Sequence, residues 1–62
     1  MPGIKVEQLA HALAGLQFPA RSWQVIAWAD YNGAAGPLRR ALRALPERTF
    51  MNLAELAAAL GL

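Results

Sequence analysis

The side chains that could take part in catalysis are few and lie far apart in this sequence. The chain has one histidine, His11, one serine, Ser22, and one threonine, Thr49. Its acidic residues are scattered along the chain: Glu7, Asp30, Glu47 and Glu55. A nucleophile needs a base and an orienting group beside it, and a metal site on a helix needs a spacing such as His-x-x-x-His. We therefore expect no catalytic residue, no metal site, no cofactor and no small-molecule substrate.

These reactive side chains have simpler structural roles. His11 falls off the apolar face of its predicted helix, so we expect it to be exposed to solvent. Ser22 is better explained as a residue at the start of a helix than as a nucleophile. Glu55 comes three residues after Asn52, a spacing close to that of a capping box. The glycines stand singly at helix ends and do not form a phosphate-binding loop.

The elements that position these residues are all predicted to be helical. Apolar residues recur at spacings of three and four, which is typical of one face of a helix. This spacing predicts a compact all-α bundle of three to four short helices at about 5–15, 21–32, 37–45 and 53–61, in a single domain, 1–62. The expected inward-facing residues are Val6, Leu9, Leu13 and Leu16, then Val25, Ile26 and Ala29, then Leu38, Ala41, Leu42 and Leu45, and finally Leu53, Leu56 and Leu60.

Proline, glycine and asparagine mark the limits of these helices. Pro19 disfavours helix at Phe18, and Asn32-Gly33 suits a left-handed helix end. Proline is well placed in the first turn of a helix, as in the third one here, and Pro46 stops that helix. We find no alternating strand pattern, and we expect Phe18 and Phe50 to lie in loops over the core.

Length and composition limit the class of protein. A chain of 62 residues without cysteine has a small core and no disulfide, so association with a partner would add stability. No stretch is long and apolar enough to cross a membrane. No signal peptide is recognisable, and we expect a cytoplasmic protein.

Two stretches resemble a known bacterial family. The first is Phe18-Pro19-Ala20, with Ala29 and Asn32-Gly33-Ala34 after it. The second is Leu42-x-x-Leu45-Pro46-x-Arg48-x-Phe50 with a capped helix after it. Together, from about Val6 to Leu60, they resemble domain of unknown function 2795. The resemblance implies a short helical bacterial protein and no established activity. This chain departs from the family in having Trp23 and Trp28 where polar residues are usual, and Arg21-Ser22 where threonine or lysine is usual.

A cluster of arginines is expected on the outer face of the third helix. Arg39, Arg40 and Arg43 fall opposite its leucines, and Arg48 follows just beyond. The short turn before this helix is compatible with a helix-turn-helix, in which the arginines would contact phosphates. The alternative is that these arginines only keep the surface soluble and suit the end of the helix.

An aromatic set on the second helix is the other candidate surface. The two tryptophans, Trp23 and Trp28, are predicted on opposite flanks of the inner face, and Tyr31 nearly outside. We expect at least one tryptophan to pack into the core, because large aromatic side chains dominate burial in small domains. An exposed tryptophan beside arginines has the composition of an interface hot spot. The alternative is that both tryptophans merely cover the edges of the core.

The sequence leads to two functional hypotheses. The leading one is a non-catalytic protein-interaction module that binds another chain or itself through Trp23, Trp28 and Tyr31. The other is a small nucleic-acid-binding protein whose arginine face contacts phosphates.

Overall fold

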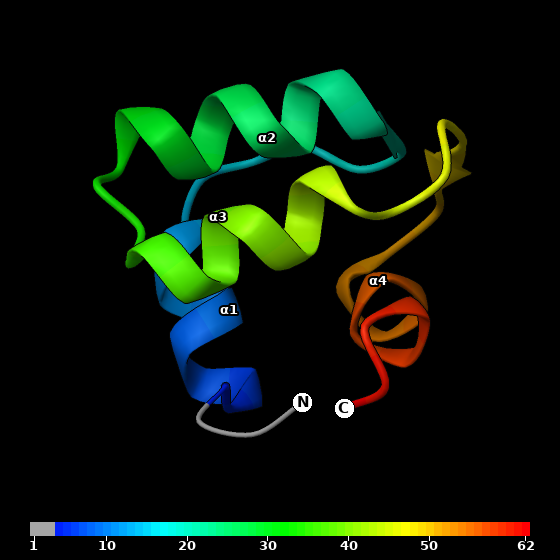
Figure 1. Cartoon of the computed structure of the whole chain (residues 1–62). Coiled ribbons are helices and arrows are strands. Elements are labelled where there is room, and N and C mark those ends of the chain that lie inside the picture. Colours follow the sequence, from blue (N-terminus) through cyan, green and yellow to red (C-terminus); the bar gives the residue numbers. More distant parts are fainter. Residues whose placement is uncertain (1–3) are drawn as a thin grey trace.

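The computed structural model describes residues 4–62, which form four helices and one pair of short strands (Figure 1). The helices are α1 (Val6–Ala12), α2 (Ser22–Tyr31), α3 (Gly36–Arg43) and α4 (Leu53–Ala59). The strands are β1 (Ala20–Arg21), directly before α2, and β2 (Thr49–Phe50), shortly before α4. The prediction of three to four short helices is confirmed, whereas the prediction of a purely all-α bundle is wrong.

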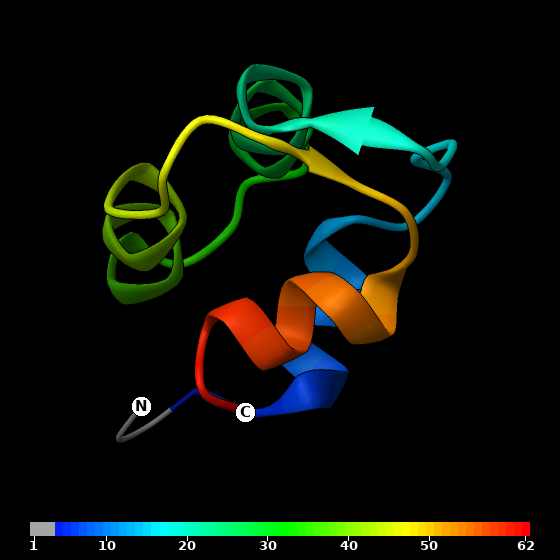
Figure 2. The same ribbon diagram turned by 90° about the vertical axis from the view of Figure 1, so that its right-hand side faces the viewer.

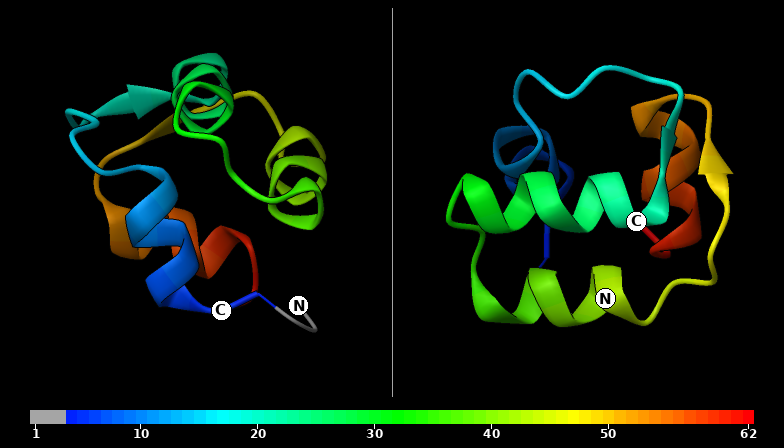
Figure 3. Two further views of the ribbon diagram at one scale, coloured as in Figure 1. Left: turned by 90° about the vertical axis from the view of Figure 1, so that its left-hand side faces the viewer. Right: turned by 90° about the horizontal axis from the view of Figure 1, so that it is seen from above.

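The helices are arranged in two layers. In one layer α2 and α3 run antiparallel and side by side, and Figure 2 shows both of them end-on. The second layer holds α1 and α4, which contact each other, and the strand pair closes one side of the molecule (Figures 2 and 3). This arrangement leaves the outer faces of α2 and α3 next to each other on one surface.

The strand pair is the element that the sequence did not predict. Its strands are antiparallel, with Ala20 opposite Phe50 and Arg21 opposite Thr49. Each strand has only two residues, too few for an alternating pattern to be recognised, and its partner lies far away in the chain. Phe50 was expected in a loop over the core, but it lies in β2 and is fully buried.

The buried residues of the helices form one core. The inward-facing leucines predicted for α3 and α4 are mostly confirmed, with Leu42 and Leu56 almost completely buried. In α1 the prediction needs two corrections. The helix ends at Ala12, because the chain then tightens into a turn in which Gly15 adopts a positive φ of 88°. Val6 is about half exposed, and Ile4, from the segment before the helix, is buried in the core.

Short-range hydrogen bonds define several helix ends. Asn52 is confirmed as the N-cap of α4, since its Oδ1 accepts from the Glu55 N–H at 2.8 Å. At the C-terminal end of α2, Asn32 follows the last residue of the helix, and its Nδ2 donates to the Ala12 carbonyl at 2.8 Å. That second bond ties the end of α2 to α1.

Candidate interaction surface

Three aromatic side chains lie exposed on α2. The exposed fractions are 61% for Trp23, 36% for Trp28 and 86% for Tyr31, and we call these three residues the aromatic stripe. The inner side of the same helix is occupied by Ser22, Val25 and Ala29, which are all buried. The helix therefore carries large apolar side chains on its solvent side as well as apolar residues on its core side.

Trp28 is held in place by the loop that follows α1. Its Nε1–H donates to the Ala14 carbonyl at 2.8 Å. Gly15 lies directly under the indole, where an added Cβ would come within 3.5 Å of the ring. The Tyr31 ring lies 6.3 Å from the Trp28 ring and is tilted by 45° to it. These contacts give Trp28 a fixed orientation at the edge of the aromatic stripe.

The prediction that at least one tryptophan packs into the core is wrong. Val25 and Ala29 fill the inner face of α2, so no inward position is left for an indole. A buried indole N–H also needs an acceptor, and Trp28 finds its acceptor in a surface loop. Trp28 therefore covers an edge of the core and is also partly exposed, so both interpretations of the tryptophans apply to it. Trp23 and Tyr31 are more exposed.

A surface groove runs beside the two tryptophans. It has a volume of about 320 Å³, and its lining residues come from α2 and from the loop before β1: Leu16, Gln17, Trp23, Gln24, Ala27 and Trp28. Most of this lining is apolar, with the amides of two glutamines at the rim. The groove offers apolar contact and a few hydrogen bonds, which is the chemistry of a docking surface.

The arginines of α3 are partly engaged by α2. The Asp30 carboxylate accepts from Arg43 Nη2 at 3.0 Å, and Arg39 Nη1 lies 3.8 Å from the same carboxylate. Arg40 forms no ion pair with any residue in the range 4–62. One aspartate thus pairs with two of the three arginines, and this row keeps an excess of positive charge. Asp30 could have been recognised from sequence, because the last turn of α2 lies beside the start of an antiparallel α3.

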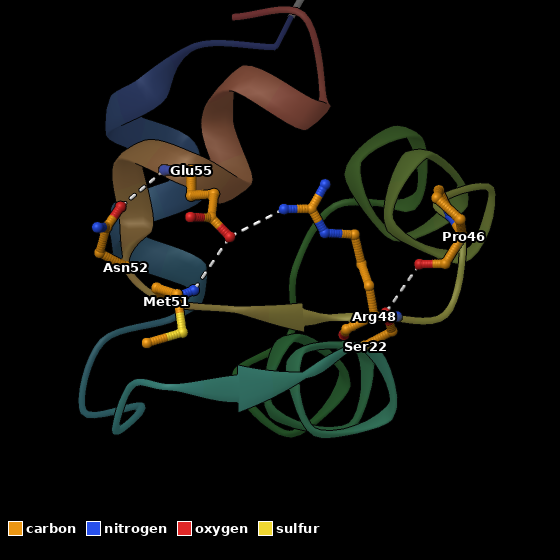
Figure 4. Close-up of polar contacts among 6 residues, drawn as sticks. All are labelled: Ser22, Pro46, Arg48, Met51, Asn52 and Glu55. Carbon is orange, nitrogen blue, oxygen red and sulfur yellow. Dashed lines mark hydrogen bonds and ion pairs between the residues drawn. The ribbon is translucent and has the colours of Figure 1, made fainter.

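Arg48 does not join that row. Its Nη2 donates to Glu55 Oε1 on α4 at 2.8 Å, and its guanidinium lies 4.7 Å from the centre of the Phe50 ring (Figure 4). The same Glu55 oxygen accepts from the Met51 N–H at 3.3 Å. Arg48 therefore links the segment just before β2 to α4, and its predicted phosphate contact stays untested.

Ser22 also has a structural role. It is buried as the first residue of α2, and its Oγ donates to the Pro46 carbonyl at 3.0 Å and accepts from the Arg48 N–H at 3.0 Å (Figure 4). These bonds fasten the start of α2 to the chain before β2. The prediction that Ser22 is a helix-start residue is confirmed.

The geometry of α2 and α3 differs from the predicted helix-turn-helix. In DNA-binding motifs of that kind the two helices cross at a large angle, so that the second one can enter the major groove. Here the two helices lie along each other as an antiparallel hairpin (Figures 1 and 2). If these arginines contact phosphates, they would do so from the outer surface of this hairpin and not from a helix inserted into a groove.

The remaining polar groups are dispersed. His11 is exposed, as expected, at the edge of a second hollow of about 200 Å³ that also touches Ile4 and Asn32. Across residues 4–62 there is no group of three or more histidine or acidic side chains that could hold a metal ion. Within that same range, no helix is both long enough and apolar enough to cross a membrane.

The model of the family described as "Protein of unknown function (DUF2795)" matches residues 4–57. No curated protein and no solved structure matched the chain.

Proposed function

The chain belongs to the DUF2795 family, and we propose that it is a non-catalytic protein-interaction module whose docking surface is the aromatic stripe of α2. The observation that carries this proposal is the exposure of Trp23 and Tyr31 on a helix that already buries its opposite face. Large apolar side chains gathered on an exposed helix face commonly mark a site that a partner covers. A partner chain would supply the missing cover. The proposal includes the cytoplasmic location expected from the sequence.

The chemistry of the stripe supports protein binding more than any other role. Tryptophan, tyrosine and arginine are the residue types enriched at interfaces and at their energetic centres. Trp28 is already fixed by its bond to Ala14, so little conformational freedom is lost there when a partner binds. The groove beside Trp23 provides a recess for a side chain of the partner.

Affinity capture tests the proposal. The full chain would be used as bait in a lysate of the cells that make it, with and without nuclease. Wild-type protein would be compared with Trp23→Ser and Tyr31→Ser variants, and with Met51→Ser as a matched control. Met51 is an exposed apolar residue, 57% accessible, outside the aromatic stripe.

We expect wild type and Met51→Ser to retain the same protein partner after nuclease treatment, and the two stripe variants to lose it. Circular dichroism would verify that each variant is folded. Retention of the same partner by both folded stripe variants would refute the proposal, as would a capture that nuclease abolishes.

A further inference from the structure

The charges next to the aromatic stripe indicate what kind of chain covers it. We propose that the occupant is an amphipathic segment of another protein, with large apolar side chains on one side and carboxylates on the flank that faces α3. This inference rests on the proposed function, and it adds the chemistry of the partner.

The first step is the adjacency of two surfaces. Asp30 lies on α2, and its carboxylate contacts Arg39 and Arg43 of α3. The two helices run alongside each other, as the right-hand view of Figure 3 shows from above. A segment that lies along the aromatic stripe therefore has the row formed by Arg39, Arg40 and Arg43 on one flank.

The second step is the charge of that row. Within residues 4–62, Asp30 is the carboxylate that pairs with α3, while Glu47 pairs with Arg21 and Glu55 with Arg48. The row thus keeps an excess of positive charge, and Arg40 is free to pair. Apolar contact on the stripe would exclude water from the flank and strengthen the attraction to carboxylates.

The third step concerns a second copy of this chain as the occupant. If two copies paired their α2 helices antiparallel about a two-fold axis, identical flanks would meet, and one arginine row would face the other. The area is also small. With about 200 Å² for a fully exposed aromatic side chain, the stripe offers roughly 400 Å², against about 800 Å² per partner in a standard interface. Charge thus disfavours antiparallel pairing of two copies, and the small area disfavours a stable dimer in either orientation. A short acidic segment fits the stripe better than a second copy.

Two synthetic peptides test this inference on the intact 62-residue chain. Each is an amphipathic peptide of about 18 residues, long enough to form a helix. Both have the same leucine and phenylalanine side, and one carries glutamate and the other lysine on the flanks. Binding would be followed through backbone amide shifts at about 0.05 M and about 0.5 M NaCl, where the Debye length falls severalfold.

The glutamate peptide is expected to shift the amides of α2 and α3 and to bind about tenfold more tightly than the lysine peptide, with the difference shrinking at high salt. Arg40→Glu should weaken the binding of the glutamate peptide by about fivefold. Lys5→Glu, which changes the net charge equally but lies at the start of α1, should leave binding unchanged. Trp23→Ser should weaken the binding of both peptides by about tenfold.

Three results would overturn the inference. If both peptides bind equally at α2 and Trp23→Ser weakens both, the acidic preference is wrong although the docking surface stands. If the glutamate peptide shifts no α2 amide at about 1 mM, a very weak affinity, the acidic segment is excluded, and lysate capture separately decides the proposed function. If the protein dimerises through α2, or if a DNA duplex shifts the α3 amides instead, the occupant is a second copy or a nucleic acid.

Discussion

The two antiparallel helices α2 and α3 differ in the side chains that they expose to solvent. On α3 the leucines face the core, and the outer face carries Arg39, Arg40 and Arg43. On α2 the core side is equally apolar, but the outer face carries the aromatic stripe. The arrangement of α3 is that of an ordinary surface helix, whereas α2 is built as though both of its sides were to be covered. The difference shows that the inner faces of both helices form the fold, and it is the reason for proposing that a partner covers the outer face of α2.

The largest expected effect lies on the inner face of α3. Leu42→Ala removes an almost completely buried side chain, and such changes typically cost about 2–5 kcal/mol of unfolding free energy. A domain this small has little stability to lose. Urea denaturation should show a large fall in the midpoint or a chain that is unfolded without denaturant. A loss below about 1 kcal/mol would mean that α3 is not part of the core.

The next effect concerns the edge of the stripe that is tied to the fold. Trp28→Phe keeps an aromatic ring but removes the Nε1–H that donates to Ala14. A hydrogen bond of this kind contributes about 1 kcal/mol, so we expect a loss of about that size in urea denaturation. The amides of residues 13–16 should also become less protected from hydrogen exchange. Unchanged stability and protection would show that Trp28 is as independent of the fold as Tyr31.

Local features of both helices were predictable from sequence, and the contacts between distant segments were not. Asn52 with Glu55, and Asn32 with Gly33, act within a few residues, so their residue types alone indicate the helix ends. The pairing of Ala20 with Phe50 depends on segments thirty positions apart in the chain, and two-residue strands carry no periodicity.

The same distinction applies to the candidate site. The outward positions of Tyr31 and of the arginines of α3 follow from helical periodicity. The acceptor of Trp28 in the α1–β1 loop, and the pairing of Arg48 with Glu55 instead of with the α3 row, depend on how the helices fold back on one another.

A smaller effect is expected at the ion pairs that join α2 to α3. Asp30→Asn removes the ion pairs with Arg39 and Arg43, which are all substantially exposed. Exposed pairs contribute little, so the loss should be about 0.5–1 kcal/mol at low salt and should diminish at high salt. The comparison variant is Glu47→Gln, which breaks the exposed ion pair with Arg21 outside the α2–α3 hairpin. A loss that does not change with salt would indicate a packing role for Asp30.

The smallest effect is expected at Tyr31, and it tests the comparison most directly. The side chain is 86% exposed and has one aromatic neighbour, so Tyr31→Ser should change the unfolding free energy by less than about 0.5 kcal/mol. A near-zero change would mean that the fold gains nothing from a large aromatic side chain at this position. Loss of partner capture by the same variant would then be a direct effect on binding, since the folded population is unchanged. A cost above about 1 kcal/mol would instead make the outer face of α2 part of the fold and remove the contrast with α3.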